Sequence, residues 1–136
     1  MGRLEIMILL DTHILLWWLH SPDRLPDEMK SEITVEESKN GILVSAISIW
    51  EIAVKTGLGK LALPLPIEEW FEMVKAYPGI VIEPLDPLDA ISSTQLPGDF
   101  HKDPADRILI AIAKRYDIFL ATMDRKILNY PYVKTL

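Results

Sequence analysis

Four short apolar runs, separated by helix-like segments, constrain this chain more than any other feature of its sequence. They cover residues 7–10, 42–45, 80–82 and 118–121. Continuous apolar runs of this length are typical of strands buried on both faces, and their alternation with helices indicates a parallel sheet. We therefore predict an α/β fold in which right-handed crossovers bring the carboxyl ends of the strands to one edge.

Helical patterns fill the segments between these strands. A chain of 136 residues can bury a core of its own, so we predict one domain over residues 1–136, with residues 1–6 as an extension. The expected elements besides the four strands are an edge strand near Val133, a short helix after Asp124, and helices over residues 12–20, 26–38, 47–56, 66–77, 87–95 and 104–116.

The composition excludes several classes of protein. Hydrophobic residues make up 49% of the chain, which is typical of a globular protein. The absence of cysteine excludes a disulfide framework and a cysteine-ligated zinc or iron–sulfur site, and it is compatible with the reducing cytoplasm, where we expect the protein. No apolar run approaches the ~20 residues that span a bilayer, so we expect no membrane partner.

The charge is unevenly distributed along the chain. The net charge is −6, whereas a nonspecific DNA-binding protein is usually basic. Residues 101–136 nevertheless carry 7 basic and 4 acidic side chains. This segment could form a basic rim that holds phosphates, although an ordinary mixed surface is the alternative. The rim would consist of Lys102, Arg107, Lys114, Arg115, Arg125 and Lys126.

Five carboxylates stand near strand ends or helix starts. Asp11 and Asp124 each follow an apolar strand, Glu51 lies within an apolar helix, and Asp103 and Asp106 begin another helix. The functional crevice of an open α/β sheet lies outside the carboxyl ends of its strands, so acids from distant segments can converge there. Converging carboxylates repel one another unless cations lie between them, and oxygen ligands suit Mg²⁺ or Mn²⁺.

Each acid also has a simpler explanation. Asp11 and Asp124 could merely cap the helices that follow them. Glu51 could merely pair with Lys55 one helical turn later, but that pair is worth only ~0.2–0.5 kcal/mol and does not account for a glutamate among apolar residues. It is the set of acids, taken from four separate segments, that indicates a metal site.

The two acids on either side of Pro104 have different expected roles. Proline favours the first helical position, which makes Asp103 the helix cap and leaves Asp106 as the preferred metal ligand. The histidines do not stand at metal-pair spacing, and we assign them surface or supporting roles. They are His13, His20 and His101.

Four segments of the chain resemble the PIN-domain family and, more narrowly, the VapC-type toxins of type II toxin–antitoxin systems. The resemblance covers essentially the whole chain, and the combination of Asp-Thr-His with Asp-Pro-x-Asp-Arg is its most specific part. The segments are Leu9–Leu19, Ser48–Ile52, His101–Arg107 and Thr122–Asp124.

The resemblance implies a three-layer α/β/α sandwich with a central, mostly parallel sheet of 4–5 strands. It implies an endoribonuclease that uses one or two Mg²⁺ or Mn²⁺ ions, forms a homodimer and is neutralised by a cognate antitoxin protein. Asp11, Glu51, Asp106 and Asp124 match the family's acidic quartet, in which Asp11 and Asp106 are the firmest metal ligands. Thr122, Asp103 and Arg107 match supporting positions.

The chemistry expected of such a site is hydrolysis of RNA phosphodiester bonds. Either Glu51 or Asp124 takes a proton from the attacking water, and the products carry 5′-phosphate and 3′-hydroxyl ends. Two other functions remain open at this stage. One is a non-catalytic PIN-like module that binds a protein, in which the acids only cap helices. The other is a metal-dependent nuclease that acts on structured DNA.

Overall fold

A computed structural model describes residues 5–100 and 103–136 of the chain. Its central sheet contains four parallel strands in the order β3-β2-β1-β4. Neighbouring strands pair in register at Leu9 with Leu43, Leu9 with Leu120, and Leu43 with Val81. The strands are β1 (Ile8–Leu10), β2 (Ile42–Ser45), β3 (Ile80–Glu83) and β4 (Phe119–Ala121).

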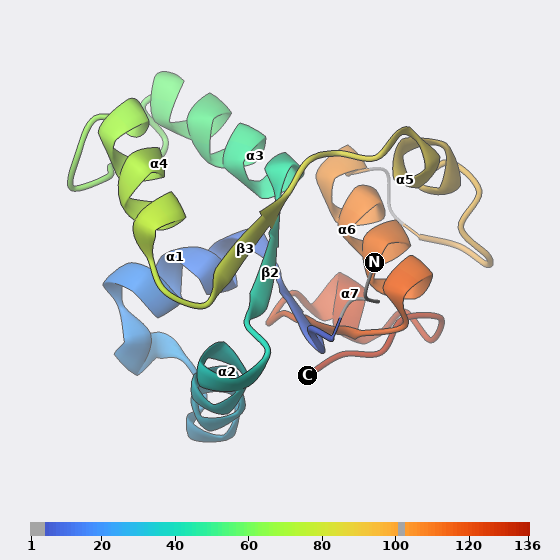
Figure 1. Cartoon of the computed structure of the whole chain (residues 1–136). Helices are drawn as coiled ribbons and strands as arrows, with labels where there is room; N and C mark the ends of the chain where they lie inside the picture. Colours follow the sequence, from blue (N-terminus) through green and yellow to red (C-terminus); the bar gives the residue numbers. More distant parts are fainter. Residues whose placement is uncertain (1–4, 101–102) are drawn as a thin grey trace.

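Helices cover both faces of this sheet (Figure 1). A one-turn 3₁₀ helix, η1 (Pro22–Arg24), links the first two of them. The α-helices are α1 (Thr12–His20), α2 (Asp27–Lys39), α3 (Ala46–Gly57), α4 (Ile67–Ala76), α5 (Pro87–Ser92), α6 (Pro104–Tyr116) and α7 (Arg125–Leu128). The predicted α/β sandwich with a parallel sheet is therefore confirmed.

Two apolar cores lie on opposite faces of the sheet. One packs α6 and α7 against β1 and β4, with Leu9, Leu109 and Leu120 fully buried. The other packs α1, α2 and α4 against the opposite face, with Trp70 and Ile33 fully buried. Because successive side chains of a strand point to opposite faces, strands that are apolar throughout supply both cores, and the burial pattern of β1 and β2 shows this.

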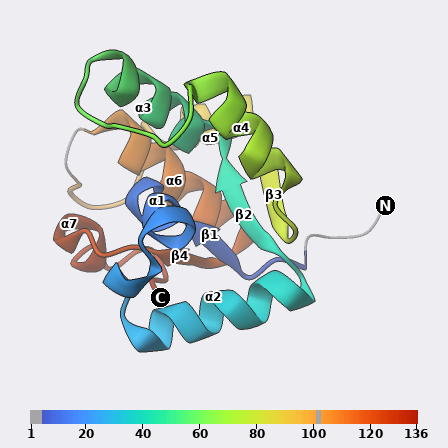
Figure 2. The ribbon, with the colours of Figure 1, turned by 90° about the vertical axis from the view of Figure 1, so that its left-hand side faces the viewer.

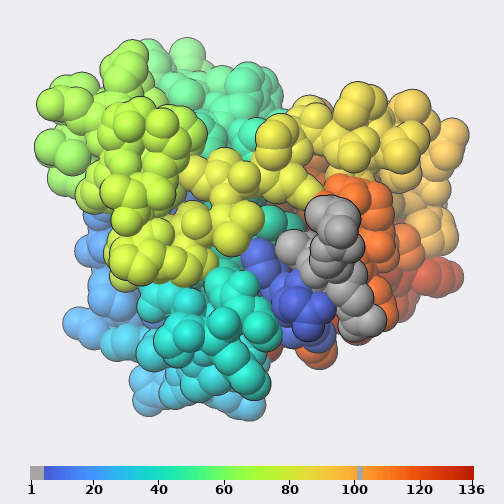
Figure 3. Space-filling model, viewed as in Figure 1, coloured from blue at the N-terminus to red at the C-terminus, as the bar shows by residue number. Residues whose placement is uncertain are grey.

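The carboxyl ends of the strands share one edge of the sheet. Helices α3 and α5 both lie at this edge, at the top of Figures 1 and 2. Strand β3 is an outer strand whose side chains are incompletely covered (Figure 3). Its Val81 is 43% exposed. The edge with the carboxyl ends is where side chains from β1, β2 and β4 can meet.

The observed elements differ from the predicted ones in a few places. Helix α5 ends at Ser92 rather than at residue 95, because the segment after it continues as single turns. The prediction of an edge strand near Val133 is wrong. The chain there forms only an isolated β-bridge, between Leu120 and Thr135. Ile6, which we placed in an N-terminal extension, is buried in the core beneath α6, while residues 1–4 lie outside the described part.

None of the helices in residues 5–100 and 103–136 has the length and apolar character that a membrane crossing requires.

Candidate functional site

Asp11 is the best-defined acid at the carboxyl edge of the sheet. It follows β1 directly and caps α1, and one carboxylate oxygen accepts a hydrogen bond of 2.7 Å from the backbone N–H of Thr12. The other oxygen accepts the hydroxyl of Thr122 at 2.7 Å. Burial raises the pKa of Asp11 above its ordinary value, and these hydrogen bonds and nearby His13 oppose that rise.

Thr122 also supports the last acid of the set. Its hydroxyl oxygen accepts a hydrogen bond of 3.0 Å from the backbone N–H of Asp124, while the hydroxyl itself donates to Asp11. Asp124 in turn caps α7 by accepting the N–H of Lys126 at 2.8 Å. One buried threonine therefore holds the acids that end β1 and β4 at a fixed spacing.

Asp106 lies in the first turn of α6, where Asp103 caps the helix by accepting its backbone N–H at 3.1 Å. The predicted capping role of Asp103 is confirmed, whereas the role of Asp106 as the preferred metal ligand stays a prediction. The pKa of Asp106 is raised to about 8, mainly by burial and then by the charges of Asp11, Asp103, Asp124 and Glu51, in that order. Burial is therefore the main cause of the raised pKa, and the neighbouring carboxylates add to it because like charges disfavour ionisation.

Glu51 reaches the same space from α3. One of its carboxylate oxygens accepts the hydroxyl of Thr12 at 2.6 Å, and the other lies 3.3 Å from the ammonium group of Lys55. The simple ion pair with Lys55 is thus present together with a hydrogen bond from the residue that follows Asp11. Glu51 is therefore tied to the first acid of the site as well as to its own helix.

A pocket of about 360 Å³ unites these residues. All four acids of the predicted quartet line it, so the acids are brought together from four elements as the sequence predicts. The lining also includes Asp103, Thr12, His13, Leu16, Ile52, Lys55, Lys60 and Leu61. A larger hollow of about 870 Å³ lies between α2 and β4, but its lining is mainly apolar and receives acids only from α2.

The pocket's chemistry fits a hard divalent cation. Carboxylate oxygens are the ligands that Mg²⁺ and Mn²⁺ prefer, and five carboxylate side chains line this pocket. As the side chains lie, no three histidine, aspartate or glutamate residues within residues 5–100 and 103–136 already surround one metal position. Binding an ion at this pocket therefore requires these carboxylates to rotate toward a common position.

Among the residues that the structure describes, none of the predicted basic side chains lines the pocket. The guanidinium group of Arg107 donates to the backbone carbonyls of Ser93 at 2.7 Å and Phe100 at 3.2 Å, so it anchors the loop before α6. Arg115 forms a two-pronged pair with the buried Asp89, at 2.7 and 2.8 Å. The prediction that these two arginines contribute to a basic rim is therefore wrong.

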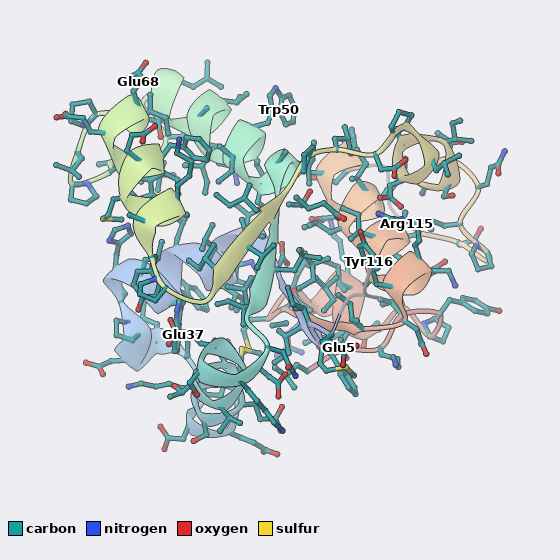
Figure 4. The ribbon with its side chains drawn as sticks, in the orientation of Figure 1. Glu5, Glu37, Trp50, Glu68, Arg115 and Tyr116 are labelled. Carbon is teal, nitrogen blue, oxygen red and sulfur yellow. The ribbon has the colours of Figure 1, made fainter. Side chains whose placement is uncertain are left out.

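Two lysines from the other half of the chain line the pocket instead. They are Lys55, at the end of α3, and Lys60, in the turn that follows. Arg125 and Lys126 are exposed but do not contribute to its lining, and Lys102 lies outside the described residues. Figure 4 shows Arg115 beside Tyr116 on α6, whereas Trp50 projects outward from α3.

His13 is a pocket residue for which the sequence suggested only a surface or supporting role. Its Nε2 accepts the backbone N–H of Met123 at 3.1 Å, so a neutral ring carries its proton on Nδ1, which lies 3.4 Å from a carboxylate oxygen of Asp11. The side chain therefore links the start of α1 to the loop that carries Asp124. The only local sign in the sequence that His13 lies at the pocket is that it stands two residues after Asp11.

Comparisons with known proteins agree with this geometry. The family model for the PIN domain matches residues 8–131. The chain is 30% identical to Ribonuclease VapC22 of Mycobacterium tuberculosis (strain ATCC 25618 / H37Rv), over 90% of this chain and 91% of that protein. The resemblance that the sequence motifs suggested is thereby confirmed.

Two solved structures share the fold at low sequence identity. The structure of DNA-bound VapBC from Salmonella typhimurium matches with a TM-score of 0.69 and 17% identity, covering 96% of this chain and 97% of that one. A toxin–antitoxin complex from Klebsiella pneumoniae matches with a TM-score of 0.60 and 18% identity, covering 94% and 96%. On the family model, the sequence identity and the fold together, this chain belongs to the PIN-domain family and is VapC-like in sequence.

Proposed function

We propose that this protein is a divalent-metal-dependent endoribonuclease that acts as the toxin of a toxin–antitoxin pair. The observation that carries the proposal is the convergence of four acids on one pocket, where the pKa of Asp106 rises to about 8. Two of them lie on α3 and α6, and the other two cap α1 and α7 after strands β1 and β4. The VapC-like sequence supports RNA as the substrate, because the relative named above is a ribonuclease.

Asp11 and Asp106 are the residues we expect to hold the cation most firmly, with Glu51 and Asp124 completing the set. One or two Mg²⁺ or Mn²⁺ ions would supply the Lewis acidity that polarises a phosphate and lowers the pKa of an attacking water. Asp11 can bind in a fixed orientation, because Thr122 and the N–H of Thr12 each hold one of its oxygens.

The other residues have distinct tasks. A carboxylate oxygen of Glu51 or Asp124 accepts the proton of the attacking water, since neither acid is fully buried. Lys60 and Lys55 stand at the pocket where they can meet the phosphates of an RNA strand. Arg107 supports the site indirectly by holding the loop that leads into α6. Hydrolysis by in-line attack leaves 5′-phosphate and 3′-hydroxyl ends.

Cleavage of RNA by the purified protein tests this function. We expect Mg²⁺- or Mn²⁺-dependent cleavage by the wild type, and loss of cleavage in Asp11→Asn with an unchanged circular dichroism spectrum. Asp23→Asn is the matched control, because Asp23 is fully exposed and lies outside the pocket. Equal cleavage by Asp11→Asn, or by the wild type in EDTA, contradicts the proposal. Cleavage of matched DNA but not RNA supports the DNA-nuclease alternative instead.

The proposed protein partner is a cognate antitoxin. The structural neighbours named above include a toxin–antitoxin complex and a VapBC assembly, and they share this chain's fold over nearly its whole length. A pocket lined by five carboxylates and two lysines is also suited to receive a basic side chain from such a partner. Loss of RNA cleavage when the neighbouring antitoxin is added at equal concentration tests this pairing.

We also propose that the protein forms a homodimer. Large apolar side chains are exposed on α3 and α5, which lie on the same side of the molecule (Figure 4). Trp50 is 56%, Leu88 63% and Ile91 56% exposed. Sedimentation analysis should find a dimer for the wild type and a monomer for Trp50→Glu. Val35→Glu is the control, because Val35 is 55% exposed but lies on α2. A monomeric wild type contradicts this proposal.

A further inference from the structure

The hydroxyl of Thr12 lies at the centre of a short chain of polar contacts beneath the acidic pocket. Its oxygen is 2.6 Å from a carboxylate oxygen of Glu51 and 3.0 Å from the hydroxyl of Ser48. Thr12 and Ser48 are 5% and 1% exposed and the side chain of Glu51 is 18% exposed, so water competes little for these contacts. They join the first residue of α1 to two residues of α3 that follow it by more than thirty positions.

The number of available protons determines which group donates and which accepts in each of these hydrogen bonds. A hydroxyl has one proton to donate, and an ionised carboxylate can only accept. The contact of 2.6 Å to Glu51 is the charge-assisted one, so Thr12 gives its proton to Glu51. Ser48 must then donate to the oxygen of Thr12, and each hydrogen bond polarises the next. The order is Ser48 to Thr12 to Glu51.

Thr12 touches two of the four acids at once. Its backbone N–H donates to Asp11 at 2.7 Å, while its side chain donates to Glu51. The second oxygen of Glu51 faces Lys55, whose side chain is 50% exposed. An exposed helical ion pair of this kind fixes a side chain weakly, whereas a buried hydroxyl fixes it firmly. The buried contact therefore determines where Glu51 points.

We propose that Thr12 is a positioning residue, which sets the orientation of Glu51 toward the pocket and its separation from Asp11. This inference rests on the proposed function for its consequence, since a correctly held Glu51 matters most when a cation binds. Groups that orient metal-binding carboxylates typically change metal affinity or activity 10- to 100-fold when removed. We therefore expect Thr12→Val, which keeps the shape and removes the hydroxyl, to weaken Mn²⁺ binding at least about tenfold.

A double-mutant cycle between Thr12→Val and Glu51→Ala tests the proposal. Mn²⁺ alone is titrated into each protein, and the free ion is followed by electron paramagnetic resonance. Thr12→Val should weaken binding in the wild-type background and cause no further change when Glu51 is already alanine. Thr12→Ser, which keeps the hydroxyl, should restore binding close to the wild-type level, and Ser48→Ala should weaken binding less than Thr12→Val.

A second readout separates this inference from the proposed function. Thermal unfolding in EDTA needs neither metal nor RNA, and the shift in midpoint caused by Thr12→Val should be smaller in the Glu51→Ala background. Equal shifts in the two backgrounds, or equal losses of Mn²⁺ affinity, overturn the positioning role. If the wild type binds no Mn²⁺, the proposed metal-dependent function fails, and the unfolding cycle still decides whether Thr12 holds Glu51.

Discussion

Replacing Asp106 with asparagine should stabilise the folded protein at high pH when no divalent metal is present. Asp106 lies in a buried position and faces the charges of Asp11, Asp103, Asp124 and Glu51, which together raise its pKa to about 8. Ionising it in the folded state therefore costs free energy that the unfolded chain does not pay. Asparagine has nearly the same shape as the protonated acid and removes that cost.

The size of the effect follows from the pKa. A rise from the ordinary value of 3.8 to about 8 corresponds to at most about 6 kcal/mol between the two protonation states. The pocket is open to water, which screens these charges, so we expect a gain of ~1–3 kcal/mol. Losing an anion from the first turn of α6 costs only ~0.3–1 kcal/mol, so the relief of repulsion prevails.

The sign of the pH dependence also follows. Between about pH 4 and about pH 8 the folded protein retains a proton on Asp106 that the unfolded chain has lost, so the wild type loses stability as the pH rises through that window. The asparagine variant has no such proton. Its advantage over the wild type should be near zero at the acidic end and greatest above pH 8.

Urea unfolding at several pH values in EDTA measures this difference, and Asp23→Asn serves as the control because its carboxylate is fully exposed. The control should change stability little at any pH. A variant that is no more stable than the wild type at pH 9, or whose advantage does not grow with pH, refutes the reasoning that the acids of the pocket repel one another.

Two further predictions concern basic residues. Arg115→Met should destabilise the fold by ~3–5 kcal/mol in urea unfolding, because it leaves the buried Asp89 without its partner; a loss no greater than that of Lys114→Met contradicts this. Lys60→Ala should raise the KM for RNA cleavage while leaving kcat nearly unchanged, because a phosphate contact made equally in the bound substrate and the transition state adds uniform binding. An unchanged KM contradicts the assignment.

Local signals predicted the fold and the four acids well. The strands were readable because they are apolar throughout, and the helix starts because Pro104 and the capping acids mark them. Asp11 and Asp124 cap their helices and line the pocket at the same time. The capping explanation and the metal explanation were therefore not true alternatives, since a cap fixes the backbone where each acid must point.

The directions of side chains and the contacts between distant residues could not be predicted from local sequence patterns. The excess of positive charge in the C-terminal segment did not reveal that Arg107 and Arg115 turn away to backbone carbonyls and to Asp89. The hydrogen bond from Thr12 to Glu51 joins residues 39 positions apart, and no local pattern encodes it. Charge counts describe composition, whereas packing decides which charges face the pocket.

The central claim is that Asp11, Glu51, Asp106 and Asp124 together bind a divalent cation. Anomalous diffraction from crystals soaked in Mn²⁺ tests it most directly, because manganese can be located without reference to activity. We predict a peak in the pocket within bonding distance of carboxylate oxygens of Asp11 and Asp106, and its loss in crystals of Asp11→Asn. Saturating Mn²⁺ with no peak in this pocket, or with a peak only elsewhere on the protein, contradicts the account.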